Sequence, residues 1–132
     1  MRWKDIISEN QEISWKAPRY SDHEVVWVDV DKIDASWAQD SNHYINGPQH
    51  PNAIGKRIDR FGDWLSTASE PVEMSVLSLD HYDRIYFGNG RHRFVWMKAH
   101  GATSLPVMVP SEQAQEIQRR FGSRDHRTTV QL

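Results

Sequence analysis

The sequence contains no cysteine, which excludes disulfide bonds, thiolate nucleophiles and thiolate-bound metal ions together. It also has no stretch near the roughly 20 consecutive apolar residues of a membrane-spanning helix. The first residues are not followed by the apolar segment of a signal peptide. From these absences we expect no membrane partner and a cytoplasmic location.

A strong excess of one charge sign is absent as well. The chain has 16 Lys and Arg residues against 18 Asp and Glu, a formal net charge of −2. A chain with this balance does not attract nucleic acid as a whole, so any contact with DNA has to be local. With 132 residues, of which 38% are hydrophobic, the composition is that of one globular domain.

The residue pattern divides the chain into three parts. Residues 1–23 are predicted to form a short helix, from Trp3, Ile6 and Ile7 at helical spacing, followed by an extended arm. Residues 24–122 form the domain, and the polar residues 123–132 form a frayed C-terminal tail.

Hydrophobic runs and turn residues predict the elements of the domain. Strands are expected at residues 24–30, 74–79, 84–87 and 105–109, the second and third joined in a hairpin by the polar residues 80–83. Helices are expected from residue 52 or 53 to 65, from 91 to about 100, and from 111 to 121 with Ser111 as N-cap. Residues 35–52 are predicted to be a long loop, which either covers a site or is disordered. The fold class is therefore α/β of the α+β type, a small mixed sheet of about four strands with three to four helices.

A glycine turn separates the strand at 84–87 from the helix that begins near Arg91. The first turn of a helix has unpaired N–H groups and a partial positive charge, and glycine lets the backbone approach a ligand closely. Arginines are unfavourable at this positive end of the helix dipole, and a bound anion would supply the missing negative charge. A phosphate or nucleotide site is therefore predicted at Gly88, Asn89, Gly90, Arg91, His92 and Arg93. On the residues alone, a plain turn with solvated cations, capped by Asn89 or Gly90, is an equally good interpretation.

The helix after this turn is apolar on more than one side. Phe94 and the pair Val95 and Ala99 are predicted to face the core. Trp96 is expected at an edge, where it could stack on a base or on a partner.

The run Gly90-Arg-His-Arg-Phe94, with Gly101 and the strand Pro106-Val-Met-Val109 after it, resembles the ParB/sulfiredoxin-like superfamily. The resemblance covers about residues 24–110 and is greatest to the plasmid fertility-inhibition proteins of the Osa type, which are reported to act on ATP and DNA. It implies a single ParB/sulfiredoxin-like domain from a plasmid, phage or mobile element. It also implies binding of ATP or a similar nucleotide, with hydrolysis of that nucleotide (an ATPase) or cleavage of DNA (a nuclease).

Arg91 departs from the superfamily in two ways. Sulfiredoxins have a cysteine at this place, so sulfiredoxin chemistry is excluded. CTP-hydrolysing ParB proteins have a glutamate there, so hydrolysis would need another carboxylate to hold Mg²⁺ or position water. Asp31 or Asp34, which this fold is expected to place beside the turn, could supply it, and His92 could act as a donor or general acid/base. Solvated acids at a strand end are the competing interpretation of the two aspartates.

No metal-ligand spacing is present among the histidines, so no protein-only metal site is expected. A Mg²⁺ ion that arrives with the nucleotide would be held mostly by phosphate and water.

Cations on two predicted helices could flank the site and hold a nucleic-acid backbone, namely Lys56, Arg57, Arg60, Arg119 and Arg120. Acidic neighbours partly neutralise them, so a solvated helix surface is the alternative. Another function class also stays open: a non-enzymatic inhibitor that docks on a larger protein machine, such as a conjugation coupling protein, through a Trp-rich surface and the 35–52 loop.

Overall fold

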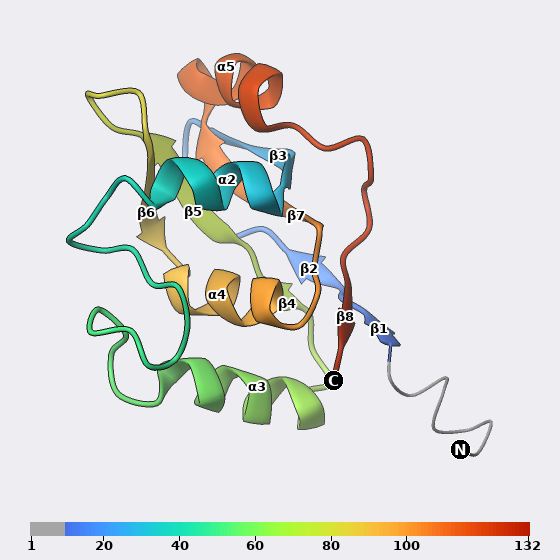
Figure 1. Cartoon of the computed structure of the whole chain (residues 1–132). Coiled ribbons are helices and arrows are strands. Elements are labelled where there is room, and N and C mark those ends of the chain that lie inside the picture. The colour runs from blue at the N-terminus through green and yellow to red at the C-terminus, as the bar shows by residue number, and fades with distance from the viewer. Residues whose placement is uncertain (1–9) are drawn as a thin grey trace.

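A mixed four-stranded sheet forms the centre of the protein. The computed structural model describes residues 10–132, so the helix predicted from Trp3, Ile6 and Ile7 lies outside the described residues. The sheet has the order β3 (His23–Asp29), β7 (Ser104–Pro110), β5 (Ser75–Leu79) and β6 (Ile85–Asn89) (Figure 1). Strand β7 pairs antiparallel with β3 and parallel with β5, and β5 pairs antiparallel with β6. The predicted mixed sheet of four strands is confirmed.

Strand β7 is an inner strand with side chains buried on both faces of the sheet. Val107 and Val109 belong to the main core, whereas Met108, pointing to the other face, packs with Met74 and Val76 in a second small cluster. Such a continuous apolar run is typical of a strand covered on both sides. The hairpin of β5 and β6 is confirmed, with Asp80 Oδ1 accepting the Arg84 N–H across the turn (3.0 Å).

Four helices are present in residues 10–132, and three of them contact the sheet. Helices α2 (Val30–Trp37), α4 (Arg91–Ala99) and α5 (Ser111–Phe121) contact its strands, and α3 (Arg57–Thr67) packs on α4. Figure 1 shows α3 and α5 on opposite sides of the molecule, with the sheet, α2 and α4 between them. The predicted α+β class is confirmed.

Helix α2 was not predicted, because the β-branched run before it continues the pattern of strand β3. Asp29 ends the strand and caps the helix, since its carboxylate accepts the Lys32 N–H at 3.1 Å. Val30, Ile33 and Trp37 then follow at helical spacing and are all buried. The loop predicted from residue 35 therefore starts only after Trp37.

Two other helix starts differ from the prediction. Helix α3 begins at Arg57, because Gly55 has a φ of +54°, which does not fit a right-handed helix. Helix α5 includes Ser111 as its first residue, and Pro110 holds the N-cap position without a side-chain hydrogen bond. Ser111 is thus not the N-cap.

The C-terminal tail is ordered, so the prediction of a frayed tail was wrong. Strand β8 (Thr129–Gln131) pairs antiparallel with β1 (Asn10–Glu12), and the short strands β2 (Trp15–Lys16) and β4 (Val72–Glu73) pair in parallel. Thr128 is fully buried; its hydroxyl donates to the Ser104 carbonyl (2.8 Å) and accepts from the Trp15 indole (3.0 Å). A single threonine therefore fastens both ends of the described chain to the sheet.

Candidate functional site

The turn between β6 and α4 has the predicted strand, glycine and helix arrangement. Gly90 is the N-cap of α4 with a φ of +82°, and no side chain caps the helix. The Ser75 hydroxyl donates to the Gly90 carbonyl (2.9 Å). A Cβ atom on residue 90 would lie 2.4 Å from Ser75 Oγ, so both the backbone angle and the close approach require glycine.

Arg93 folds back over this turn. Its Nη2 would lie 2.7 Å from a Cβ atom on Gly90. Nε and Nη2 of Arg93 are buried and have no hydrogen-bond partner within residues 10–132. Burial lowers the pKa of Arg93, while the negative charge of Glu73 raises it. Buried polar groups are nearly always paired, so a guanidinium with two unpaired nitrogens indicates that a partner is missing.

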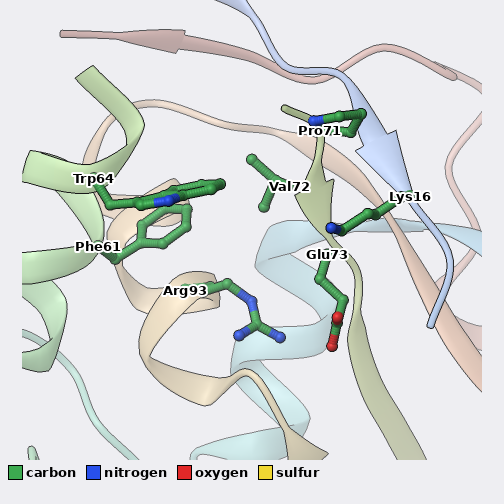
Figure 2. Close-up of a pocket in the computed structure, with 7 residues that line it drawn as sticks. All are labelled: Lys16, Phe61, Trp64, Pro71, Val72, Glu73 and Arg93. Carbon is green, nitrogen blue, oxygen red and sulfur yellow. The ribbon is translucent and has the colours of Figure 1, made fainter. Parts of the chain in front are cut away.

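Arg93 lies between two adjoining hollows that share Phe61, Trp64 and Arg93 itself. The first, which we call the arginine hollow, has a volume of about 340 Å³, and its other lining residues are Arg57, Arg60, Asn89, Gly90 and His92. The second, which we call the Glu73 hollow, has a volume of about 240 Å³ and is lined in addition by Lys16, Pro71, Val72 and Glu73. Figure 2 shows the Arg93 guanidinium and the Glu73 side chain directed toward the same space.

Helix α3 forms one wall of both hollows. Arg57, Arg60, Phe61 and Trp64 follow the i, i+3, i+4, i+7 spacing of a single helix face. Trp64 is 39% exposed despite its size. The spacing of apolar residues in the sequence assigns Phe61 to the core and does not single out Trp64. The sequence pattern that indicates this wall is the alternation of arginine and aromatic residues along one face of the helix.

His92 lines the arginine hollow but faces the chain before α3. Its Nε2 accepts the Ile54 N–H (3.1 Å), so a neutral imidazole carries its proton on Nδ1. Burial, followed by the positive charges of Arg91 and Arg57, lowers the pKa of His92 to about 4. The ring is therefore neutral near pH 7 and acts as an acceptor that holds residue 54.

The other predicted residues of the turn differ in position. Gly88 and Asn89 are exposed at the end of β6, and Asn89 lines the arginine hollow. Arg91 lines neither hollow, because its Nη1 donates to the His43 carbonyl (2.7 Å) in the segment after α2. Of the predicted arginines of the turn, Arg93 is the one that faces the hollows.

The two aspartates predicted beside the turn are not brought to it. The Asp34 carboxylate accepts from Lys98 Nζ (2.6 Å) and from the Tyr44 hydroxyl (3.1 Å). Lys98 is in the last turn of α4, about 10 Å along the axis from Arg91. Asp31 is exposed in the first turn of α2. Glu73 is the only carboxylate among the described residues that lines either hollow.

The two basic clusters do not flank a common site, so that prediction was wrong. Arg57 and Arg60 line the arginine hollow, and Lys56 lines a separate one with Asp59. The other two cations are on α5, on the opposite side of the molecule (Figure 1). There Arg119 pairs with Glu116 through Nε (2.7 Å), and Arg120 donates to the Asp83 carbonyl (2.9 Å).

Of the five tryptophans within residues 10–132, Trp37 and Trp96 are buried, Trp15 and Trp27 are partly exposed, and Trp64 is exposed. Trp37 is fully buried, and Trp96 is 5% exposed, stacked on His100 with its indole nitrogen against Gly62. Trp96 was predicted to lie at an edge but is buried. Ala99 was predicted to face the core but is exposed. The tryptophan surface that the described residues expose is therefore Trp64 with parts of Trp15 and Trp27.

The segment after α2 is held in place by its own contacts. Ile45 is buried, and Asn52 Nδ2 donates to the carbonyls of Ser41 and Tyr44 (3.0 and 2.8 Å). Within residues 10–132, no three His, Asp or Glu side chains come together in a way that could hold a metal ion. No helix in the same range is long and apolar enough to cross a membrane.

Comparison with known proteins identifies relatives for this arrangement. The sequence profile of a family described as Plasmid Fertility inhibition factor matches residues 25–122. The fold is similar to the crystal structure of Oncogenic Suppression Activity Protein, described as a plasmid fertility inhibition factor, in its gold(I) cyanide derivative. The TM-score is 0.56 at 15% sequence identity, over 85% of this chain and 62% of that chain. This chain thus spans about three fifths of that structure. No curated protein matches the sequence of this chain.

Proposed function

Because the chain belongs to the plasmid fertility inhibition factor family, we propose that it acts as a fertility inhibition factor that binds a nucleotide, ATP or a related one. The nucleotide lies across the two hollows beside α3, with its phosphates in the arginine hollow. The proposal concerns binding, and hydrolysis is not part of it.

One observation carries this proposal: Nε and Nη2 of the Arg93 guanidinium are buried and have no partner among the described residues. Leaving buried donors unpaired costs roughly 1–3 kcal/mol, and more for a charged group. A bound phosphate would supply acceptor oxygens in the geometry that an arginine fork prefers. The unpaired donors are thus the feature of a site that a ligand completes.

The surroundings of Arg93 support the same ligand. Arg57 and Arg60 add two exposed cations on the facing helix, and the hollow borders the first turn of α4, whose partial positive charge attracts anions. Phe61 and Trp64 offer aromatic surface on which a base can stack. A Mg²⁺ ion bound with the nucleotide would be held chiefly by phosphate oxygens and water.

Contacts of the other candidate residues favour binding over turnover. Asp34 is occupied by Lys98 and Tyr44, and His92 accepts a backbone hydrogen bond as a neutral ring. Asp34 therefore lies away from the arginine hollow, whereas His92 lines it as a neutral ring that holds the Ile54 N–H.

Thermal unfolding with and without nucleotide tests the proposal. We would add ATP, GTP, CTP or ADP, each with Mg²⁺, to the wild type and to an Arg57→Gln/Arg60→Gln variant, whose exposed substitutions leave the core intact. Ligand at 100 times its dissociation constant stabilises the folded state by about 2.7 kcal/mol. We expect this gain in the wild type, its loss in the double variant, and its retention in an Arg119→Gln control on α5. No gain in the wild type at millimolar nucleotide would refute the proposal.

A protein partner is the alternative that the family also permits. A plasmid transfer assay separates the two: a nucleotide-binding role predicts that Arg93→Gln, which removes the buried fork, relieves inhibition. Full inhibition by this variant, after it is shown to be folded and unable to bind nucleotide, would favour a non-enzymatic inhibitor that docks on its target.

A further inference from the structure

We infer that Glu73 is a specificity-determining residue that recognises the base of the bound nucleotide, and that it favours guanine. The inference rests on the proposed function, since it assumes that a nucleotide occupies the two hollows.

Glu73 is available for a ligand. It is on β4 in register with Lys16 on β2, and its side chain lines the Glu73 hollow, with the carboxylate on the side of the Arg93 guanidinium (Figure 2). Among the described residues, it forms no ion pair and accepts no side-chain hydrogen bond. Lys16 Nζ lies toward Glu70 (3.9 Å), and the cation on which the charge of Glu73 acts is Arg93.

The distribution of charge sets the direction of the nucleotide. The arginine hollow has three arginines and no carboxylate, so it attracts phosphate. The Glu73 hollow has two cations, Lys16 and Arg93, which Glu73 partly offsets, so it attracts phosphate less than the arginine hollow does. Its other walls are Pro71, Val72 and the two shared aromatic side chains, and apolar walls with a few polar groups are what a nucleobase requires. The base therefore lies in the Glu73 hollow.

A carboxylate selects among bases because it only accepts hydrogen bonds. Guanine presents two neighbouring donors on its Watson–Crick edge, N1–H and the 2-amino group, which can bind both carboxylate oxygens at once. Adenine and cytosine offer one amino group beside a ring nitrogen lone pair, which the carboxylate repels. Uracil offers one N–H between two carbonyl oxygens. A paired contact of this kind discriminates by about tenfold or more.

Binding titrations on the full chain test the inference, with Mg²⁺ and GTP, ITP, ATP, UTP or pyrophosphate as probes. ITP lacks only the 2-amino group, and pyrophosphate measures the phosphate contacts alone. We expect the wild type to bind GTP about tenfold or more tightly than ATP and UTP, with ITP between them. Glu73→Gln should lose this ranking and bind pyrophosphate as the wild type does. Glu70→Gln is the matched control, since this nearby acid lies outside both hollows, and it should keep the preference for GTP.

The outcomes separate the two proposals. Equal binding of all nucleotides by the wild type, or an unchanged ranking in Glu73→Gln, would overturn the role of Glu73 and leave nucleotide binding intact. Failure of every nucleotide and of pyrophosphate to bind the wild type would instead reject nucleotide binding, and the role of Glu73 with it.

Discussion

The backbone N–H of Ile54 donates a hydrogen bond to Nε2 of His92, which joins two segments 38 residues apart in the sequence. Ile54 precedes α3, and His92 is in the first turn of α4. The contact thus holds together the two elements that carry Arg57 and Arg93, on either side of the arginine hollow. Its strength depends on a neutral imidazole, because a protonated ring cannot accept at Nε2.

Acidification is expected to destabilise the protein through His92. Its pKa falls from an ordinary value of 6.5 to about 4 in the folded state, because of burial and the neighbouring Arg91 and Arg57. Between these values the unfolded chain binds the proton more tightly, so the free energy of unfolding is fully retained above pH 6.5 and declines as the pH falls toward 4. The loss amounts to about 1–3 kcal/mol, because the ring borders a solvated hollow that moderates the effect of burial.

Urea unfolding at pH 7.5 and at pH 4.5 measures this loss. A His92→Gln variant keeps an acceptor near Ile54 but does not titrate, so its stability should fall less over the same interval. The difference between the two proteins removes the contribution of other titrating groups. Parallel pH profiles for the wild type and the variant would contradict the prediction.

Substitution of Gly90 by alanine is expected to destabilise the fold by about 2–4 kcal/mol. The new Cβ would meet Ser75 Oγ at 2.4 Å and Ser75 Cα at 3.0 Å, and the φ of +82° is strained for any residue with a side chain. Chemical denaturation measures the change. Gly47→Ala is the control, since nothing lies within 4 Å of the methyl group that alanine would add there and its φ is not positive. An equal effect at both glycines would disprove the explanation.

Substitution of Asp34 by asparagine is expected to reduce stability by about 1–2 kcal/mol, because Lys98 loses its half-buried charge partner. Nucleotide affinity in the presence of Mg²⁺ should stay unchanged, since Asp34 is remote from the arginine hollow. Asp31→Asn, an exposed change on the same helix, is the control and should alter stability by less than about 0.5 kcal/mol. A marked fall in Mg²⁺-dependent affinity of Asp34→Asn would restore the catalytic role expected from the sequence.

Local patterns were sufficient for the main elements of the domain. The alternation and β-branching of residues 24–29, 75–79 and 105–109 predicted their strands, and Gly90 and Gly101 marked the limits of the helix between them. Elements whose signals depend on a neighbour were missed. Helix α2 begins directly after β3 at Val30, which also fits the strand pattern, and β8 is polar except for Val130, which is buried where β8 pairs with β1.

The sequence by itself determined the class of fold, the glycine turn and the presence of arginines at the start of α4, since these depend on backbone angles and on residues close in the chain. Only the tertiary structure decided which charged groups meet. In the folded protein Arg91 donates to the His43 carbonyl and Asp34 accepts from Lys98. Arg93 lies between α3 and Glu73. The reason is physical: side-chain pairing across elements is set by how helices and strands pack, and packing is a property of the whole core that no local spacing specifies.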